Sequence, residues 1–419
     1  MNVIKIRKLD KQLRGTLQLP ASKSISNRLL IMRALSTEDF TITKLSESED
    51  TILLGKLLNT VKSSQNKKGL TELNTGNAGT AMRFLTAFLA MLPGKWVLTG
   101  NARMKQRPIG ILVDALKPLG ASIEFLGSLG FPPLLINGRI LKGGEIVVDP
   151  GISSQFVSAL MMIAPKIPGG MVLHLSGQPV SYPYVNMTIR LLEDFGVKVV
   201  HERSYLKIPA CNYQPHEYCV EADWSAAAFW YEAAALAEDV DLFLAGLKKD
   251  SLQGDSVLVD LYKCFGVHTE FLESGIRLVK SPERRENCSF NFSDFPDIAP
   301  SVITTCAVLG MHGKFEGLKS LKIKETDRIL ALKNEYAKMG ITIETNLEGD
   351  FFSKIELIRT NINLPPGIRF KTYDDHRMAM TFAPLAIRSG EVFIESPEVV
   401  AKSYPGFWTD LKTLGFEIT

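Results

Sequence analysis

The chain has 419 residues, of which 45% are hydrophobic and 22% charged, so it is long enough for two or three cores of ordinary domain size. Its 48 basic and 45 acidic residues give a formal net charge of +3, which excludes a chain-wide attraction to nucleic acid or anionic lipid. Apolar runs such as residues 154–165 fall well short of the roughly 20 residues that span a bilayer. The first ten residues do not resemble a secretion signal, so we expect a cytoplasmic protein.

The first predicted element is a strand within residues 1–10, where charged and apolar side chains alternate. A helix is predicted next, beginning in 20-PASKSISNR-28 and continuing through the apolar run 29-LLIMRAL-35. Lys23, Ser24 and Arg28 gather at its start, and all three side chains are suited to binding phosphate. We therefore expect this helix start to line an anion site.

A short pattern recurs after successive helix-like stretches: a hydrophobe, a glycine, a hydrophobe, any residue, and then mostly a hydrophobe or threonine. Each copy precedes a predicted strand, so each glycine fits the left-handed position that ends a helix. The spacings are 76, 70, 74 and 75 residues, and the glycines are Gly120, Gly196, Gly266, Gly340 and Gly415.

A second series consists of residues that commonly cap helices, each of which stands at the start of a short apolar run. From its second member onward the spacings are 76, 70, 74 and 77 residues, and the members are Ser24, Asn77, Ser153, Asp223, Asp297 and Asp374. Two patterns with one period predict six copies of an α/β unit of roughly 70 residues, the first of them shortened. The runs 225–237 and 301–310 are apolar almost all round, which is typical of buried helices. Helix starts of this kind would bring backbone N–H groups and positive dipole ends to a cleft.

Basic residues fall largely at the starts of these units. Taken singly, each fits a solvated surface charge. Arg107 precedes a proline and Arg377 directly precedes an apolar run, however, and arginine there suggests a bidentate clamp for phosphate or carboxylate. The other basic residues in the pattern are Lys23, Arg28, Arg103, Lys105, Lys322, Lys324, Arg328 and Lys402.

Two polar segments precede other apolar runs. Residues 153–155 (SSQ) can both cap a helix and bind a ligand, whereas capping alone needs one of them. The segment 76-GNAGT-80 allows close backbone approach, although a plain turn fits it about as well. The chain has neither a Walker motif nor G-x-G-x-x-G, so ATP and nicotinamide binding lose their main support.

Three residues are candidates for acid and base chemistry: Asp297, Glu325 and His376. Asp297 could instead be a helix N-cap, and Glu325 could form an ion pair with Arg328 on a helix face. A carboxylate beside several cations is held ionised and can act as a base. The segment 374-DDHR-377 does not favour a metal site, because these side chains seldom point at one ion and no second His/Cys cluster exists in the sequence.

Ten motifs together resemble the 5-enolpyruvylshikimate-3-phosphate synthase family, and they occur in family order nearly end to end: PASKSISNR, GNAGTAMR, RMKQRPIG, SSQFVSAL, SYPYVNMTI, EADWSAAAF, PDIAPS, KIKETDRI, YDDHRMAM and AKSYPGF. The resemblance implies an inside-out α/β barrel of two domains, each made of three βαβαββ units around an interdomain cleft. One domain would comprise residues 1–21 and 224–419, and the other residues 22–223.

The resemblance also implies the reaction, which is transfer of the enolpyruvyl group of phosphoenolpyruvate to the 5-hydroxyl of shikimate 3-phosphate with release of phosphate. Asp297, Glu325 and Lys23 would be catalytic. Shikimate 3-phosphate would contact Lys23, Ser24, Arg28, Ser153, Ser154, Gln155, Ser181, Asp297 and Lys324. Phosphoenolpyruvate would contact Lys23, Gly79, Arg107, Gln155, Arg328, Arg377 and Lys402. No metal or organic cofactor, nucleic acid or membrane is implied, and the family is usually monomeric.

The chain departs from the family at Phe84, where proline is common, at Ser320, where many members have asparagine, and at Tyr182, where lysine is frequent. Two alternatives stay open. One is the related transferase that acts on UDP-N-acetylglucosamine, which uses a loop cysteine, whereas this chain has no cysteine before Cys211. The other is an inactive anion-binding relative, against which the joint presence of Lys23, Asp297 and Glu325 argues.

Overall fold

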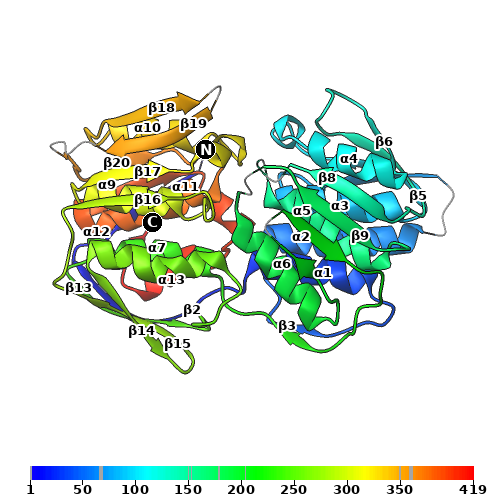
Figure 1. The fold of residues 1–419 in the computed structure, drawn as a ribbon. Helices are drawn as coiled ribbons and strands as arrows, with labels where there is room; N and C mark the ends of the chain where they lie inside the picture. Colours follow the sequence, from blue (N-terminus) through cyan, green and yellow to red (C-terminus); the bar gives the residue numbers. More distant parts are fainter. Residues whose placement is uncertain are drawn as a thin grey trace. The chain divides into compact units, whose positions relative to one another are not determined.

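Short strands alternate with helices along the whole chain in a computed structural model, which describes residues 2–65, 69–149, 151, 153–177, 180–202, 204–348, 351–357 and 362–419 (Figure 1). The fold is therefore mixed α/β, as the sequence predicts. Within these residues no helix combines the length and the apolar character that crossing a membrane requires.

The chain divides into two compact units. The terminal unit comprises Met1–Ser22, Glu47–Glu49 and Glu221–Thr419, and the middle unit comprises Lys23–Ser46 and Asp50–Val220. Both labelled chain ends lie in the terminal unit (Figure 1).

The middle unit contains two four-stranded sheets and one two-stranded sheet among its described residues. In sheet order the first has β4 (Leu70–Asn74), β5 (Gly94–Thr99), β7 (Leu134–Gly138) and β6 (Ser122–Phe125). The second has β8 (Gly144–Val148), β9 (Met171–Leu175), β11 (Tyr205–Ile208) and β10 (Val200–His201). The two-stranded sheet pairs β3 (Ile42–Thr43) with β12 (Tyr218–Cys219).

Helices α1, α3 and α5 of the middle unit contact one another. Most of their residues are buried, because apolar side chains cover nearly the whole circumference of α3 and α5. The helices of this unit are α1 (Lys23–Leu35), α2 (Glu49–Ser64, of which the first residue belongs to the terminal unit), α3 (Gly79–Met91), α4 (Gly110–Leu116), α5 (Ser154–Ile163) and α6 (Tyr182–Asp194).

The terminal unit contains three four-stranded sheets among its described residues. The first has β2 (Gln12–Gln18), β13 (Asp239–Ala245), β15 (Gly275–Lys280) and β14 (Val267–Leu272). The second has β16 (Asn287–Asn291), β17 (His312–Glu316), β19 (Phe351–Leu357) and β18 (Ile343–Glu348). The third has β20 (Ile368–Phe370), β21 (Glu391–Glu395), β1 (Val3–Arg7) and β22 (Glu417–Ile418).

Helices α7, α9 and α11 contact one another in the terminal unit, and each also contacts a strand of a different sheet (Figure 1). All residues of α7 except Ser225 are buried, as are all residues of α9 and α11. The helices of this unit are α7 (Trp224–Leu236), α8 (Leu258–Leu261), α9 (Ala299–Val308), α10 (Arg328–Ala337), α11 (His376–Phe382), α12 (Ala386–Ser389) and α13 (Phe407–Thr413).

The four-stranded sheets share one pairing pattern. In each, the first two strands in the order above are parallel, and the remaining neighbours are antiparallel. In β13 the burial alternates with the two-residue strand period, so Val240, Leu242 and Leu244 face the core. The sheet of β3 and β12 retains only the parallel pair among the described residues.

The glycine series is confirmed as a set of helix ends. All five glycines have φ between 69° and 94°, the left-handed region that glycine enters without a steric penalty. Each follows a helical segment and precedes one of the strands β6, β10, β14, β18 and β22.

The predicted caps are partly wrong. Ser153 and Asp223 are the N-caps of α5 and α7, and each side chain accepts a hydrogen bond from a backbone N–H of its helix. Asp374 is not a cap, because its neighbour Asp375 caps α11. The cap positions of α3 and α9 belong to Ala78 and Ile298 rather than to Asn77 and Asp297, and Ser24 lies inside α1. Asn77 and Asp297 use their side chains for other contacts, described below.

Candidate active site

Asp297 stands directly before Ile298, the N-cap of α9, and its carboxylate contacts three cations. Oδ1 lies 3.2 Å from Nη1 of Arg328 and 3.3 Å from Nζ of Lys324, and Oδ2 lies 3.1 Å from Nη2 of Arg377. The predicted alternative, a simple helix cap, is wrong for Asp297. Residues 297, 324, 328 and 377 are thus brought together within the terminal unit.

The same three cations set the ionisation of Asp297. Burial by itself would raise the pKa of this carboxyl, but Arg377, Lys324 and Arg328 outweigh burial and hold the pKa well below its ordinary value. Asp297 is therefore ionised at neutral pH. It is also a weak base while the three cations face it, and it gains basicity when their charge is taken up by an anion.

Arg328 is 1% exposed and is held from two further sides by carboxylates. Its Nε and Nη2 donate to Asp375 at 2.8 and 3.3 Å, and Nη2 also donates to Glu325 at 2.9 Å. Burial would lower the pKa of the guanidinium, and Asp375, Glu325 and Asp297 reverse this and raise it. Arg328 is thus a fixed positive charge in a defined orientation.

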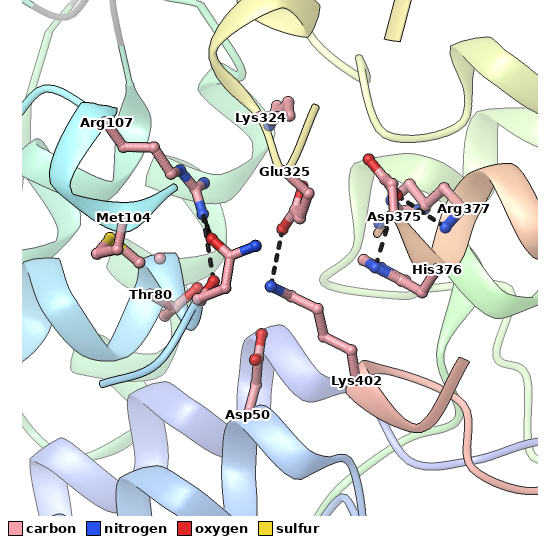
Figure 2. A network of polar contacts seen from close by, with 12 residues as sticks. Asp50, Thr80, Met104, Arg107, Lys324, Glu325, Asp375, His376, Arg377 and Lys402 are labelled. Carbon is pink, nitrogen blue, oxygen red and sulfur yellow. Dashed lines mark hydrogen bonds and ion pairs between the residues drawn. The ribbon is translucent and has the colours of Figure 1, made fainter. Parts of the chain in front are cut away.

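Glu325 links Arg328 to Lys402. Its Oε1 lies 3.3 Å from Nζ of Lys402, and Figure 2 shows the two side chains facing each other. The predicted ion pair with Arg328 exists, but Glu325 is not on a helix face, because α10 begins at Arg328 and is capped by Asp327. Glu325 and Lys402 are 10% and 11% exposed, so both are largely shielded from water.

Asp375 has two roles in this network. Its Oδ1 accepts from the backbone N–H of Arg377 at 2.9 Å, which caps α11, and Figure 2 shows Asp375 beside Arg377. Both oxygens of Asp375 also hold Arg328. His376, the third acid–base candidate, is 2% exposed and lies in the first turn of α11, with Nδ1 3.7 Å from Asp375. Asp375 was not among the residues predicted from sequence.

Lys23 occupies the first turn of α1 in the middle unit. Its Nζ lies 3.2 Å from Oδ2 of Asp50, a residue of α2 that sequence reasoning did not select. The two side chains are 16% and 9% exposed. The pair holds the lysine in place and offsets its charge.

Arg28 is 2% exposed and lies in α1, where it donates to four oxygens. They are Thr188 Oγ1 at 2.7 Å, the Ser24 carbonyl at 2.9 Å, Ser158 Oγ at 3.0 Å and a carbonyl of α6 at 3.1 Å. Its guanidinium also lies 5.5 Å from the ring centre of Phe84. Burial lowers its pKa to about 10, so it remains charged at neutral pH. Arg28 therefore ties α1 to α3, α5 and α6.

Arg107 packs against the start of α3 (Figure 2). Its Nη1 lies 3.3 Å from the carbonyl of Asn77 and 3.5 Å from Oδ1 of the same residue. A Cβ at Gly79 would lie 2.7 Å from Nη2 of Arg107, so glycine is needed here for close approach rather than for a turn. The GNAGT segment is thus fitted to this arginine.

The start of α5 carries three predicted ligand-binding residues. Ser153 caps the helix, Ser154 is 5% exposed, and Gln155 donates from Nε2 to Oγ1 of Thr80 on α3 at 3.2 Å. Ser181 lies at the N-cap position of α6 with φ 56°, a left-handed conformation that serine adopts rarely. Residues with a strained backbone conformation occur often at ligand-binding sites.

Comparison with known proteins identifies the family. A family model described as EPSP synthase (3-phosphoshikimate 1-carboxyvinyltransferase) matches residues 8–411. The chain belongs to the EPSP synthase family. A 3-phosphoshikimate 1-carboxyvinyltransferase of Bacteroides fragilis (strain YCH46) is 46% identical over 412 residues, 97% of each chain. A protein of the same description from Vibrio cholerae (strain M66-2) is 36% identical over 419 residues, which cover 94% of this chain and 95% of that protein.

Two solved structures share the fold of this family member. EPSP synthase from Acinetobacter baumannii aligns with a TM-score of 0.77 over 100% of this chain and 99% of that chain, at 22% identity. The enolpyruvyl transferase NikO from Streptomyces tendae aligns with a TM-score of 0.78 over 100% and 98%, at 14% identity.

Sequence reasoning missed Asp50 and Asp375, the carboxylates that hold Lys23 and Arg328. Asp375 had one signal, its place beside two selected residues in DDHR. Asp50 had none, because nothing in 47-ESED-50 distinguishes it from its acidic neighbours.

The structure places the three residues at which the chain departs from the EPSP synthase family. Phe84 is buried and its ring lies against the guanidinium of Arg28, and burial raises the pKa of Tyr182. Ser320 lies in the 3₁₀ helix Lys319–Ile323.

Proposed function

We propose residue roles for the reaction of this EPSP synthase family member, which transfers the enolpyruvyl group of phosphoenolpyruvate to the 5-hydroxyl of shikimate 3-phosphate in aromatic amino acid biosynthesis. Asp297 takes the proton from the 5-hydroxyl as that oxygen attacks C2 of phosphoenolpyruvate. Glu325, together with Lys23, delivers a proton to C3, with the ammonium group of Lys23 as the source of that proton. Reversed proton transfers then expel phosphate and leave the enolpyruvyl ether.

The observation that carries this assignment is the contact of Asp297 with Arg328, Arg377 and Lys324. These cations are matched to the anionic groups of the substrates and to the charge of the tetrahedral adduct. When the substrates' phosphate and carboxylate oxygens engage the cations, less of their field acts on Asp297. Its pKa then rises and it becomes a stronger base, so substrate binding itself prepares the base.

The binding roles follow the resemblance. Phosphoenolpyruvate would be held by Lys23, Gly79, Arg107, Gln155, Arg328, Arg377 and Lys402. Shikimate 3-phosphate would be held by Lys23, Ser24, Arg28, Ser153, Ser154, Gln155, Ser181, Asp297 and Lys324. The contacts of Arg28 within the middle unit suggest that its first task is to hold α1 in place, so that Lys23 and Ser24 are presented correctly.

The charge of the proposed site is smaller than the sequence implied. Its seven cations are Lys23, Arg28, Arg107, Lys324, Arg328, Arg377 and Lys402. Asp297 and Glu325 reduce the total from +7 to +5, and the newly found Asp50 and Asp375 reduce it to +3. Each substrate brings about −2.5 to −3, counting one phosphate and one carboxylate. The remaining attraction would come from backbone N–H groups at helix starts such as that of α5.

We further infer that the terminal and middle units are the two domains of the inside-out α/β barrel, each built from three related units. The shared pairing pattern of the four-stranded sheets supports this, and the sheet of β3 and β12 would be the shortened first unit. That the protein is a cytoplasmic monomer and needs no cofactor remains a prediction.

A phosphate-release assay tests the proposed function. The purified chain is incubated with phosphoenolpyruvate and either shikimate 3-phosphate or UDP-N-acetylglucosamine, with phosphoenolpyruvate alone as the control. Phosphate release that depends on shikimate 3-phosphate is expected. Release with the UDP-sugar instead would assign the rival transferase, and release with neither acceptor would leave an inactive anion-binding relative.

A further inference from the structure

A second buried carboxyl group, Asp255, lies at the start of α7 in the terminal unit. It belongs to the 3₁₀ helix Gly254–Val257 and is 2% exposed. Ser225 donates its hydroxyl to Oδ2 of Asp255, and the neighbouring Gln253 accepts from the backbone N–H of Trp224 at 3.0 Å. The Asp255 segment is therefore fixed against the first turn of α7.

Helix capping does not account for Asp255. The first two backbone N–H groups of α7 are already satisfied, that of Trp224 by Gln253 and that of Ser225 by Asp223. Oδ1 of Asp255 is buried and has no hydrogen-bond partner among the described residues. Within the same residues, no lysine, arginine or histidine forms an ion pair with Asp255.

A buried carboxylate with one hydrogen bond and no paired cation is costly, so Asp255 holds its proton to a higher pH than an exposed aspartate does. Burial raises the pKa of Asp255 most, and the negative charges of Asp297 and Asp223 raise it further. The hydrogen bond from Ser225 and the positive charge of Arg377 lower it, and the resulting pKa is about 7. The charged groups that face Asp255 are thus Asp297, Asp223 and Arg377. Two of these belong to the proposed active site, so any charge on Asp255 acts on that site.

We propose that Asp255 is a positioning residue for the proposed reaction: protonated, it leaves Arg377 to Asp297 and to the anionic substrate, and its ionisation as the pH rises through neutrality weakens phosphoenolpyruvate binding. The step is a reversible loss of one proton to solvent. The ionised form adds one negative charge beside Asp297, repels the substrate's phosphate and carboxylate, and draws on the positive charge of Arg377. The inference rests on the proposed function, because it needs phosphoenolpyruvate at Arg377.

Asp255→Asn tests this inference, since asparagine has the same shape and stays uncharged at every pH. The KM for phosphoenolpyruvate and kcat are measured between pH 6 and 9 for wild type and variant. We expect the wild-type KM to rise by at least about threefold through the region near pH 7, as one added charge at moderate distance would produce. The KM of Asp255→Asn should lack this rise. The ionisation of the substrate's own phosphate affects both proteins equally and cancels in the comparison.

Two further variants make the test specific. Asp250→Asn makes the same change at an exposed carboxylate five residues away and should keep the wild-type pH profile. Ser225→Ala removes the hydrogen bond that lowers the pKa of Asp255, so it should move the rise in KM to higher pH. A shift in a pH midpoint also distinguishes this role from a loss of folded protein, which would lower kcat alike at every pH.

The possible outcomes are separable. Wild-type protein without transferase activity would overturn the proposed function. An active wild type whose KM profile is reproduced by Asp255→Asn would overturn the role of Asp255 alone. A KM rise that is absent in Asp255→Asn, displaced in Ser225→Ala and retained in Asp250→Asn would establish it.

Discussion

Asp375 holds Arg328 through two nitrogens of one guanidinium, Nε at 2.8 Å and Nη2 at 3.3 Å, and both side chains are at most 1% exposed. A buried arginine held on that edge presents Nη1 in a fixed direction, here toward Asp297, while Nη2 is shared between Asp375 and Glu325. The arrangement holds the guanidinium of Arg328, which we propose binds phosphoenolpyruvate, in one orientation.

Asp375→Asn should weaken this arrangement while keeping the cap of α11, because asparagine caps helices as well as aspartate does. Removing a partner from a buried ion pair costs about 3–5 kcal/mol. Arg328 keeps two other carboxylates, so we expect a loss of about 2 kcal/mol in the free energy of unfolding. The kcat/KM for phosphoenolpyruvate should fall at least about tenfold, since this needs only 1.4 kcal/mol. Denaturant unfolding and steady-state kinetics measure the two effects.

The matched control for that experiment is Asp374→Asn. Asp374 is exposed and has φ 55°, a conformation that asparagine tolerates. The Asp374→Asn variant should keep the free energy of unfolding and the kinetic constants near those of the wild type. Equal losses in the two variants would show that Asp375 has no special relation to Arg328.

Gly79→Ala should displace Arg107, because the added Cβ would lie 2.7–2.9 Å from three guanidinium atoms. The end of an arginine side chain can move, so the protein should stay folded. We expect the KM for phosphoenolpyruvate to rise about tenfold or more with a smaller change in kcat, because the proposed charged hydrogen bond between Arg107 and the substrate would be lost. Gly55→Ala, on α2 with no atom near its added Cβ, is the control. An unchanged KM in Gly79→Ala would remove Arg107 from the binding role.

Asp297→Ala should cut kcat by at least the roughly 100-fold typical of a lost general base. The same change removes a negative charge from beside Arg377, Lys324 and Arg328, so the KM for phosphoenolpyruvate should stay constant or fall. A fall in kcat without a rise in KM separates a base from a structural residue. Turnover near the wild-type rate would exclude Asp297 as the base.

Glu232 should make stability depend on pH. It lies in α7 and is fully buried, with Oε2 accepting from Ser301 at 2.9 Å. Burial raises its pKa well above the ordinary value, despite the hydrogen bond from Ser301. The folded state then binds the proton more tightly than the unfolded chain, so this contribution is full below about pH 4 and is lost as pH rises toward the folded pKa.

Glu232→Gln removes the titrating proton with little change of shape. Its melting temperature relative to wild type should therefore rise progressively between pH 5 and pH 8. Thermal unfolding across that range measures the difference, with Glu273→Gln at an exposed position as the control. A constant difference across the range would mean that Glu232 does not carry a raised pKa.

The local features of the fold were predictable from sequence where one residue type is required by the backbone. Gly120 and Gly266 illustrate this, because a left-handed helix end strongly favours glycine and therefore leaves a mark at a fixed period. Caps were less predictable, since several residue types serve and neighbours compete. The carboxylate of Asp375 accepts the backbone N–H of α11 although Asp374 stands beside it.

The candidate site was predictable as a set of charges and not as a set of contacts. Arg377 was selected for its place before an apolar run and Arg328 as one of the basic residues at the unit starts, but their meeting at Asp297 depends on the packing of α9, α10 and α11. Asp255 had no sequence signal, because its importance comes from burial beside residues distant in the chain. Position in sequence does not report burial of a single carboxyl group.

The pairing of β1 with β21 and β22 has a consequence for synthesis on the ribosome. Residues 3–7 leave the exit tunnel long before their strand partners, residues 391–395 and 417–418, have been translated. The middle unit is nearly continuous in sequence and can form while translation proceeds. The nascent N-terminal strand must instead wait, unpaired, for almost the whole polypeptide. A chain truncated before residue 417 would therefore lack β22, and β1 would be left without one of its two strand partners.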